Sequence, residues 1–225
     1  MDWTLYIICF GVPLILGLAV QAWLRNTFAK NSRVPVGSGM TGADVARRIL
    51  DSNGLQNVPV QPSKAGPLSD HYDPKTRGVF LSEAVYAGRS VAATAVAAHE
   101  VGHAIQHAKA YVPMTLRSAI WPVAALGSQA WFFILFAGLI FGAFGLVQLA
   151  LVVFSLVIVF QLVTLPVEFN ASRRAMAQIR ELGLVTDTEA VGARQTLTAA
   201  AMTYVAGALA SIAQLMYFLA IFGRN

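Results

Sequence analysis

The fold class of this chain is decided by residues 118–167, SAIWPVAALGSQAWFFILFAGLIFGAFGLVQLALVVFSLVIVFQLVTLPV, a run of 50 residues without a charged side chain. A single helix of that length would extend about 75 Å, whereas the hydrocarbon core of a bilayer is about 30 Å thick. The run therefore predicts two membrane-spanning helices, at residues 118–141 and 146–167. They would be joined by a turn at Gly142–Gly145.

Two further charge-free runs predict two more crossings. Residues 3–24 are long enough for one span. Their positive charges follow the apolar run instead of preceding it, which is typical of an anchor and not of a cleaved signal peptide. Residues 195–223 are rich in Ala, Gly and Ser, which allow helices to pack closely in lipid, and predict a fourth helix at 197–222.

The composition agrees with a membrane protein. Only 12% of the residues are charged and 56% are hydrophobic, whereas a soluble domain carries about 25% charged residues. This excludes a disordered chain and argues against a soluble domain. The net charge of +5 is better matched to anionic lipid than to nucleic acid, because basic residues collect beside the cytoplasmic leaflet. Cys9 is the sole cysteine, so neither an intramolecular disulfide nor a cysteine-based metal site is expected.

The distribution of basic residues predicts the topology. Of the 16 lysines and arginines, 11 lie in residues 25–117 and four in residues 168–194, whereas the turn after residue 141 carries none. Because loops rich in Lys and Arg stay in the cytoplasm, both polar segments are expected on the cytoplasmic side of the cell membrane. Both termini of this multi-pass chain are then expected outside.

Within residues 25–117 the sequence predicts a small α+β unit. Residues 41–54 have the pattern of an amphipathic helix with Thr41 as its N-cap. Residues 68–82 alternate polar and apolar side chains around a D-P-K-T-R-G turn, which predicts a β-hairpin. Residues 90–108 are rich in helix-forming residues and begin with Ser90, a good N-cap, so they predict a longer helix.

That last helix contains His99-Glu100-Val101-Gly102-His103, the pattern H-E-x-x-H. Residues four apart share a helix face, so His99 and His103 can bind one Zn²⁺. Glu100 beside them can take a proton from zinc-bound water and pass it to the leaving amine. The alternative is a helix whose histidines only line a polar cavity.

Zinc in a catalytic site needs a third protein ligand. A metzincin is excluded because Ile105 and Lys109 stand where glycine and histidine would be required. His107 lies about 6 Å of rise beyond the second histidine, too far to share the ion. Glu168 ends the long apolar run on the same predicted side of the bilayer, and Pro166 can start a helix with Glu168 in its first turn. Glu168 is therefore the predicted third ligand, the alternative being ordinary charge at a helix N-terminus.

Residues 70–108, DHYDPKTRGVFLSEAVYAGRSVAATAVAAHEVGHAIQHA, together with residues 160–175, FQLVTLPVEFNASRRA, resemble the YugP-like family of membrane zinc metallopeptidases. More distantly the chain is similar to HtpX-type and CAAX-prenyl proteases, gluzincins in which a helix bearing E-[FY]-x-A-D supplies the third ligand. The resemblance implies that Glu168 is that ligand, followed by Phe169 as the aromatic residue.

Continuing along that helix, the resemblance places Ala171 at the alanine of the motif. Ser172 stands where the distant relatives have aspartate. A carboxylate that orients a zinc histidine is therefore missing, and Asn170 or Ser172 would supply a weaker hydrogen bond in its place.

The resemblance also implies a use for the hairpin. In zincins an exposed strand beside the active-site helix pairs with an extended peptide substrate, and Ser69–Asp73 is the matching edge here. His71 or Tyr72, or else Arg173 or Arg174, would stabilise the tetrahedral oxyanion. The alternative for each of these residues is that its side chain faces solvent or contacts lipid phosphate.

Together these features predict a mainly α membrane protein of about four transmembrane helices with a small cytoplasmic α+β zincin-like metallopeptidase unit. Residues 25–117 would form that unit, and residues 168–194 a cytoplasmic helix with the third ligand. The expected activity is zinc-dependent hydrolysis of peptides or membrane proteins with one Zn²⁺ per chain, in quality control or processing. The alternative is an inactive zinc-containing scaffold or adaptor; a metal transporter is disfavoured because the spans hold no Asp, Glu, Lys, Arg or His.

Overall fold

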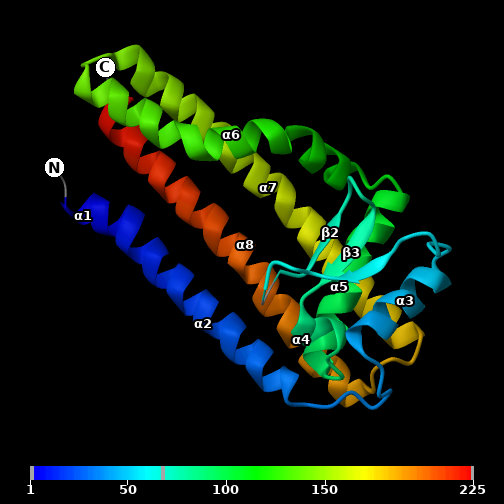
Figure 1. Ribbon diagram of the computed structural model, residues 1–225. Coiled ribbons are helices and arrows are strands. Elements are labelled where there is room, and N and C mark those ends of the chain that lie inside the picture. Colours follow the sequence, from blue (N-terminus) through cyan, green and yellow to red (C-terminus); the bar gives the residue numbers. More distant parts are fainter. Residues whose placement is uncertain (1–2, 67–68, 224–225) are drawn as a thin grey trace. The chain divides into compact units, whose positions relative to one another are not determined.

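The computed structural model describes residues 3–66 and 69–223. Its elements in chain order (Figure 1) are α1 (Trp3–Tyr6), the π-helical η1 (Ile7–Gly11), α2 (Val12–Ser32), α3 (Gly42–Ser52), β1 (Val60–Pro62), β2 (His71–Asp73), β3 (Gly78–Leu81), α4 (Glu83–Tyr86), α5 (Val91–Ala108), α6 (Val112–Ile140), α7 (Phe144–Glu181) and α8 (Asp187–Phe222).

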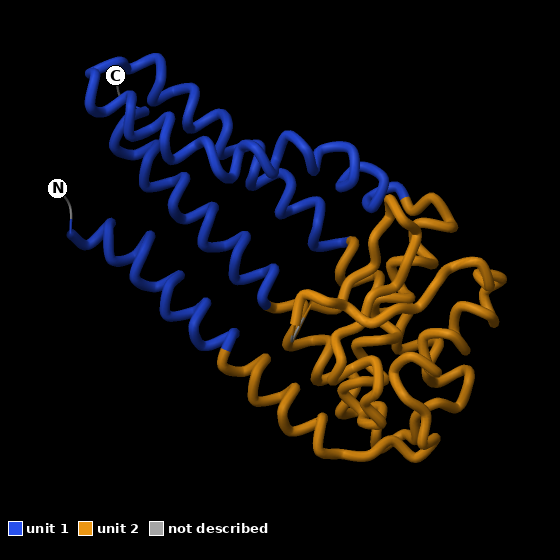
Figure 2. The backbone as a smooth tube through the Cα atoms, viewed as in Figure 1, with its two compact units in different colours: residues 1–21, 112–166, 203–225 blue, residues 22–111, 167–202 orange. Residues whose placement is uncertain are grey.

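The chain divides into two compact units, coloured separately in Figure 2. The helical unit comprises the described residues among 1–21, 112–166 and 203–225, and the α+β unit comprises those among 22–111 and 167–202. All three strands belong to the α+β unit. Each unit is therefore assembled from segments that are far apart in the sequence.

Four helices of the described chain are long and apolar enough to cross a membrane, in agreement with the charge-free runs. They are Trp3–Ser32, which joins α1, η1 and α2, together with α6, α7 and α8. Large apolar side chains on the helical unit are exposed, including Leu126 at 72% and Phe133 at 71%. Such a surface suits contact with lipid tails, because exposing large apolar side chains to water is unfavourable.

Inside the helical unit, α6 and α7 pack closely beside the turn that joins them. A Cβ added at Gly138 would lie 2.9 Å from the backbone nitrogen of Val147, so only glycine lets the two backbones approach. Gly142 turns the chain with a φ of +61°, a conformation that favours glycine. Farther along, Trp131 stacks on Phe154 with ring centroids 4.3 Å apart.

The helix start expected at Pro166 was wrong. No helix starts at Pro166, because α7 runs continuously through it from Phe144 to Glu181. Proline removes one N–H from the helical ladder, but its fixed φ is compatible with a helix, so a long helix tolerates it at a cost of about 3 kcal/mol. The expected polar helix over 168–194 is in fact the end of α7, a short connection and the beginning of α8.

The α+β unit contains a three-stranded sheet in the order β1-β3-β2. Strands β2 and β3 form the expected antiparallel hairpin, with Tyr72 opposite Val79, and β1 pairs in parallel with β3. Residue 68, where the hairpin was expected to begin, lies outside the described residues. Strand β2 is thus an edge strand of the described sheet.

The core of the α+β unit is formed by apolar faces of α3 and α5 and by the end of α7. Ile49 and Leu50 of α3, Val101 of α5 and Ile179 of α7 all belong to one buried cluster and have no exposed surface. Thr41 caps α3 as expected, with its hydroxyl accepting a hydrogen bond from the Asp44 backbone N–H at 3.1 Å. This core fixes the position of α5, the helix with the histidine motif.

Candidate metal centre

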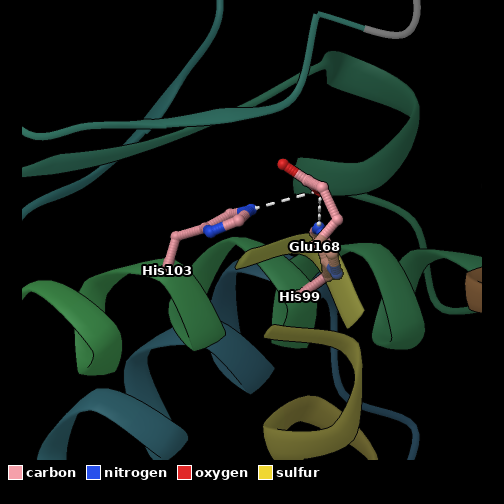
Figure 3. A group of neighbouring side chains, drawn as sticks. All are labelled: His99, His103 and Glu168. Atoms are coloured by element: carbon pink, nitrogen blue, oxygen red, sulfur yellow. Dashed lines mark hydrogen bonds and ion pairs between the residues drawn. The ribbon is translucent and has the colours of Figure 1, made fainter. Parts of the chain in front are cut away.

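Two helices of the α+β unit bring three ligand-type side chains together (Figure 3). α5 begins after Ser90, whose hydroxyl accepts the Ala93 backbone N–H at 3.2 Å, and its alanine-rich sequence keeps it helical through the histidine motif. His99 and His103 therefore project from one face of α5. α7 presents Glu168 to the same point.

The three side chains converge through atoms that can bind a metal. Glu168 Oε2 lies 3.2 Å from His99 Nε2 and 3.6 Å from His103 Nε2. One ligand atom from each residue lies within 4.8 Å of the others. The side chains are mostly buried, with 14%, 8% and 4% of the surface of His99, His103 and Glu168 exposed.

This donor set fits a catalytic zinc site. Two imidazoles and one carboxylate are the three protein ligands that such sites use, and the fourth position stays open for water. A carboxylate as buried as that of Glu168 needs a positive charge beside it. A divalent cation between the three side chains would satisfy that need, so the residues present fit zinc.

Glu100 lies beside this cluster without joining it. Its side chain is buried, and its pKa is raised from the ordinary 4.5 to about 7, with burial as the largest cause. The negative charges of Glu168 and Asp70 contribute to this rise, whereas His99 and the backbone N–H of Tyr72 oppose it. A carboxyl group with a pKa near the working pH is suited to exchanging protons.

Gly102, between the two histidines, allows α7 to approach α5. A Cβ added there would lie 2.7 Å from the carbonyl oxygen of Ala171 and 3.2 Å from its Cα, and Ala171 is fully buried. Backbone atoms cannot move aside as a flexible side chain can. The absence of a side chain at position 102 thus sets the helix spacing that brings Glu168 to the histidines.

Replacing Gly102 by alanine is expected to destabilise the apoprotein by about 1–3 kcal/mol, the usual cost of overpacking, and to weaken zinc binding. Thermal unfolding and zinc titration of the purified protein measure the two effects. Gly207→Ala is the matched control, because nothing lies within 4 Å of a Cβ added at Gly207. Identical melting and identical zinc affinity of the two variants would contradict the role given to Gly102.

The distal nitrogens of both histidines have hydrogen-bond partners. Ser172 Oγ lies 3.1 Å from His99 Nδ1, the contact that the resemblance implies for Asn170 or Ser172. Gln106 Oε1 lies 3.0 Å from His103 Nδ1. Gln106 was missed by sequence reasoning, although its position three residues after His103 puts it on the same helix face.

The other predicted site residues lie around this cluster. Tyr72 is half-buried and its hydroxyl lies 2.7 Å from His107 Nδ1, so His107 contacts the hairpin and is not one of the three clustered ligands. His71 is exposed and stacks on Phe80, and Arg173 is exposed on α7. The oxyanion roles of Tyr72, His71 and Arg173 stay predictions.

Comparison with known proteins identifies a zinc peptidase family. A family model described as "Putative neutral zinc metallopeptidase" matches residues 6–223. A relative named "Putative membrane protease YugP", from Bacillus subtilis (strain 168), is 46% identical over 217 residues, which cover 94% of this chain and 96% of the relative. No solved structure matches the chain.

Proposed function

The chain belongs to this zinc metallopeptidase family, as its resemblance to YugP-like proteins implies, and from that premise we propose that it is an integral membrane zinc endopeptidase. The observation that carries the proposal is the convergence of His99, His103 and Glu168 on one point, with Glu100 buried beside it. An H-E-x-x-H motif together with a glutamate as the third zinc ligand would make this protein a gluzincin. Its substrates would be peptides or membrane proteins that require processing or quality control.

In the proposed mechanism His99, His103 and Glu168 would hold one zinc ion through the converging atoms His99 Nε2, His103 Nε2 and Glu168 Oε2. Zinc bound there supplies Lewis acidity toward a peptide carbonyl and toward water. The Glu100 carboxylate takes a proton from the attacking water as the new C–O bond forms. It then gives that proton to the amine nitrogen as the C–N bond breaks, so that the carboxylate is regenerated.

Strand β2 supports a position for the substrate. It is the edge of the described sheet, and the backbone N–H of its Tyr72 faces the Glu100 carboxylate. An extended peptide that paired with this edge would lie against the helix with the histidines. Pairing through the backbone gives affinity with little dependence on sequence, which suits a protease for varied substrates.

The site is proposed to lie on the cytoplasmic side of the cell membrane, with both termini outside. The support is the concentration of Lys and Arg in residues 25–117 and 168–194, which flank the apolar spans. The two segments meet in the α+β unit, since that unit contains residues from both.

The test is cleavage of a mixed peptide library by sealed membrane vesicles that carry the protein. Inside-out vesicles are expected to cleave peptides, right-side-out vesicles are not, and a zinc chelator is expected to abolish cleavage until Zn²⁺ is restored. Cleavage that survives complete removal of the metal would contradict the zinc mechanism. Cleavage by right-side-out vesicles alone would contradict the sidedness.

A further inference from the structure

We propose that Gln106 is a positioning residue of the metal centre, which makes Nε2 of His103 the metal-binding atom and ties α5 to α7. The inference rests on the proposed zinc site and concerns how that site is built. Gln106 has no exposed surface, so its polar amide must find its partners inside the α+β unit. Its amide forms three hydrogen bonds, two of them to α7.

The contacts of Gln106 determine the orientation of its amide. Its Nε2 lies 2.8 Å from the carbonyl oxygen of Val167, which can only accept a hydrogen bond. The same nitrogen lies 3.1 Å from Asn170 Oδ1. Arg174 Nε, which can only donate, lies 2.7 Å from that Asn170 oxygen and so identifies it as an acceptor. Both N–H groups of Gln106 are therefore directed to α7.

The oxygen of the Gln106 amide must then face His103. Gln106 Oε1 has only lone pairs, so the hydrogen in its 3.0 Å contact with His103 Nδ1 belongs to the histidine. In a neutral imidazole with a hydrogen on Nδ1, Nε2 carries the lone pair. Nε2 is the atom that faces Glu168 Oε2, at 3.6 Å, which is too long for a hydrogen bond. Two lone-pair atoms that face each other across this gap form a site for a cation.

The bond to Val167 also fixes the distance between the ligands. Val167 directly precedes Glu168 on α7, and it is fully buried. Gln106 therefore holds the backbone that carries the carboxylate ligand while its oxygen holds the second histidine of α5. One side chain thereby orients one ligand and sets the position of another.

The test compares metal binding by the apoprotein and its Gln106→Met variant, which has a similar side-chain length and no hydrogen bonds. Co²⁺ is the probe, since its visible absorption reports coordination geometry, and competition with Zn²⁺ gives both affinities. Loss of an outer hydrogen bond to a metal ligand weakens binding about 10–100-fold. Gln106→Met is expected to fall in that range and to change the Co²⁺ spectrum.

Gln178→Met is the matched control for loss of a glutamine that hydrogen-bonds within the same unit. Gln178 lies on α7 and contacts Asn53 and Glu181, away from the three ligands. The Gln178→Met variant is expected to retain wild-type Co²⁺ affinity and spectrum, whatever its effect on thermal unfolding of the apoprotein.

Gln106→Glu is a second test variant. It keeps an acceptor for His103 and loses the donors to α7, so its metal affinity should fall less than that of Gln106→Met.

Wild-type metal affinity and spectrum in Gln106→Met would overturn the inference and leave the proposed function intact. The inference would also be overturned if Gln106→Met and Gln178→Met lost equal metal affinity together with equal thermal stability. If Gln106→Met fails to fold, wild-type affinity in Gln106→Glu is the overturning result. Failure of the wild-type protein to bind either metal would instead contradict the proposed function, and this inference with it.

Discussion

Glu100→Gln is expected to lose peptide cleavage while it keeps its zinc. Glutamine has the shape of glutamate, so the buried position can be filled without repacking. It has no carboxylate to accept a proton, and the contribution of a general acid–base group is about 10²–10⁴-fold in rate. A fall of that size in kcat is expected, because the zinc ligands His99, His103 and Glu168 are unchanged. Cleavage of a fluorogenic peptide and the zinc content of the same preparation measure both quantities.

Glu83→Gln is the control for this substitution. Glu83 is an exposed acid at the start of α4 in the same unit, and its replacement is expected to leave the cleavage rate unchanged. Cleavage at the wild-type rate by Glu100→Gln would remove Glu100 from the mechanism. A wild-type protein that binds zinc and cleaves no peptide, with partner binding insensitive to Glu100→Gln, would favour a scaffold instead.

The four apolar helices could be predicted because a run without charges has a direct physical meaning in a bilayer. The ends of those helices could not. A charge-free run marks the residues suited to lipid, whereas the helix continues wherever its backbone hydrogen bonds continue. α7 therefore extends past Pro166 to Glu181, and α8 begins at Asp187, well before the expected residue 197.

The candidate ligands could be predicted for a similar reason. His99 and His103 follow from the periodicity of one helix, and Glu168 was placed by the predicted topology together with the family motif. Gln106 and the contact between Tyr72 and His107 depend on which elements pack together. The spacing places Gln106 beside His103 on one helix, but it does not show the hydrogen bond from Gln106 to α7 or the one between β2 and His107, because these form only when the elements pack together.

Glu168→Gln is expected to abolish stable zinc binding. The amide oxygen of glutamine is neutral and binds zinc far more weakly than a carboxylate does, and only the two imidazoles would remain. The side chain of Glu168 is 4% exposed, so water cannot easily replace the lost ligand. Because the cleavage mechanism depends on zinc, the variant is also expected to lose activity.

Glu181→Gln is the matched control, since Glu181 lies on the same helix and is exposed at its end. It removes the same charge from α7 without touching the three ligands. The thermal unfolding of both apoproteins shows whether either substitution disturbs the fold.

The most direct test of the zinc site is the zinc-to-protein ratio of the purified proteins, measured by elemental mass spectrometry after dialysis against a weak chelator. The wild-type protein and Glu181→Gln are expected to retain about one zinc per chain, and Glu168→Gln to retain almost none. Full retention of zinc by Glu168→Gln would contradict the assignment of Glu168 as the third ligand.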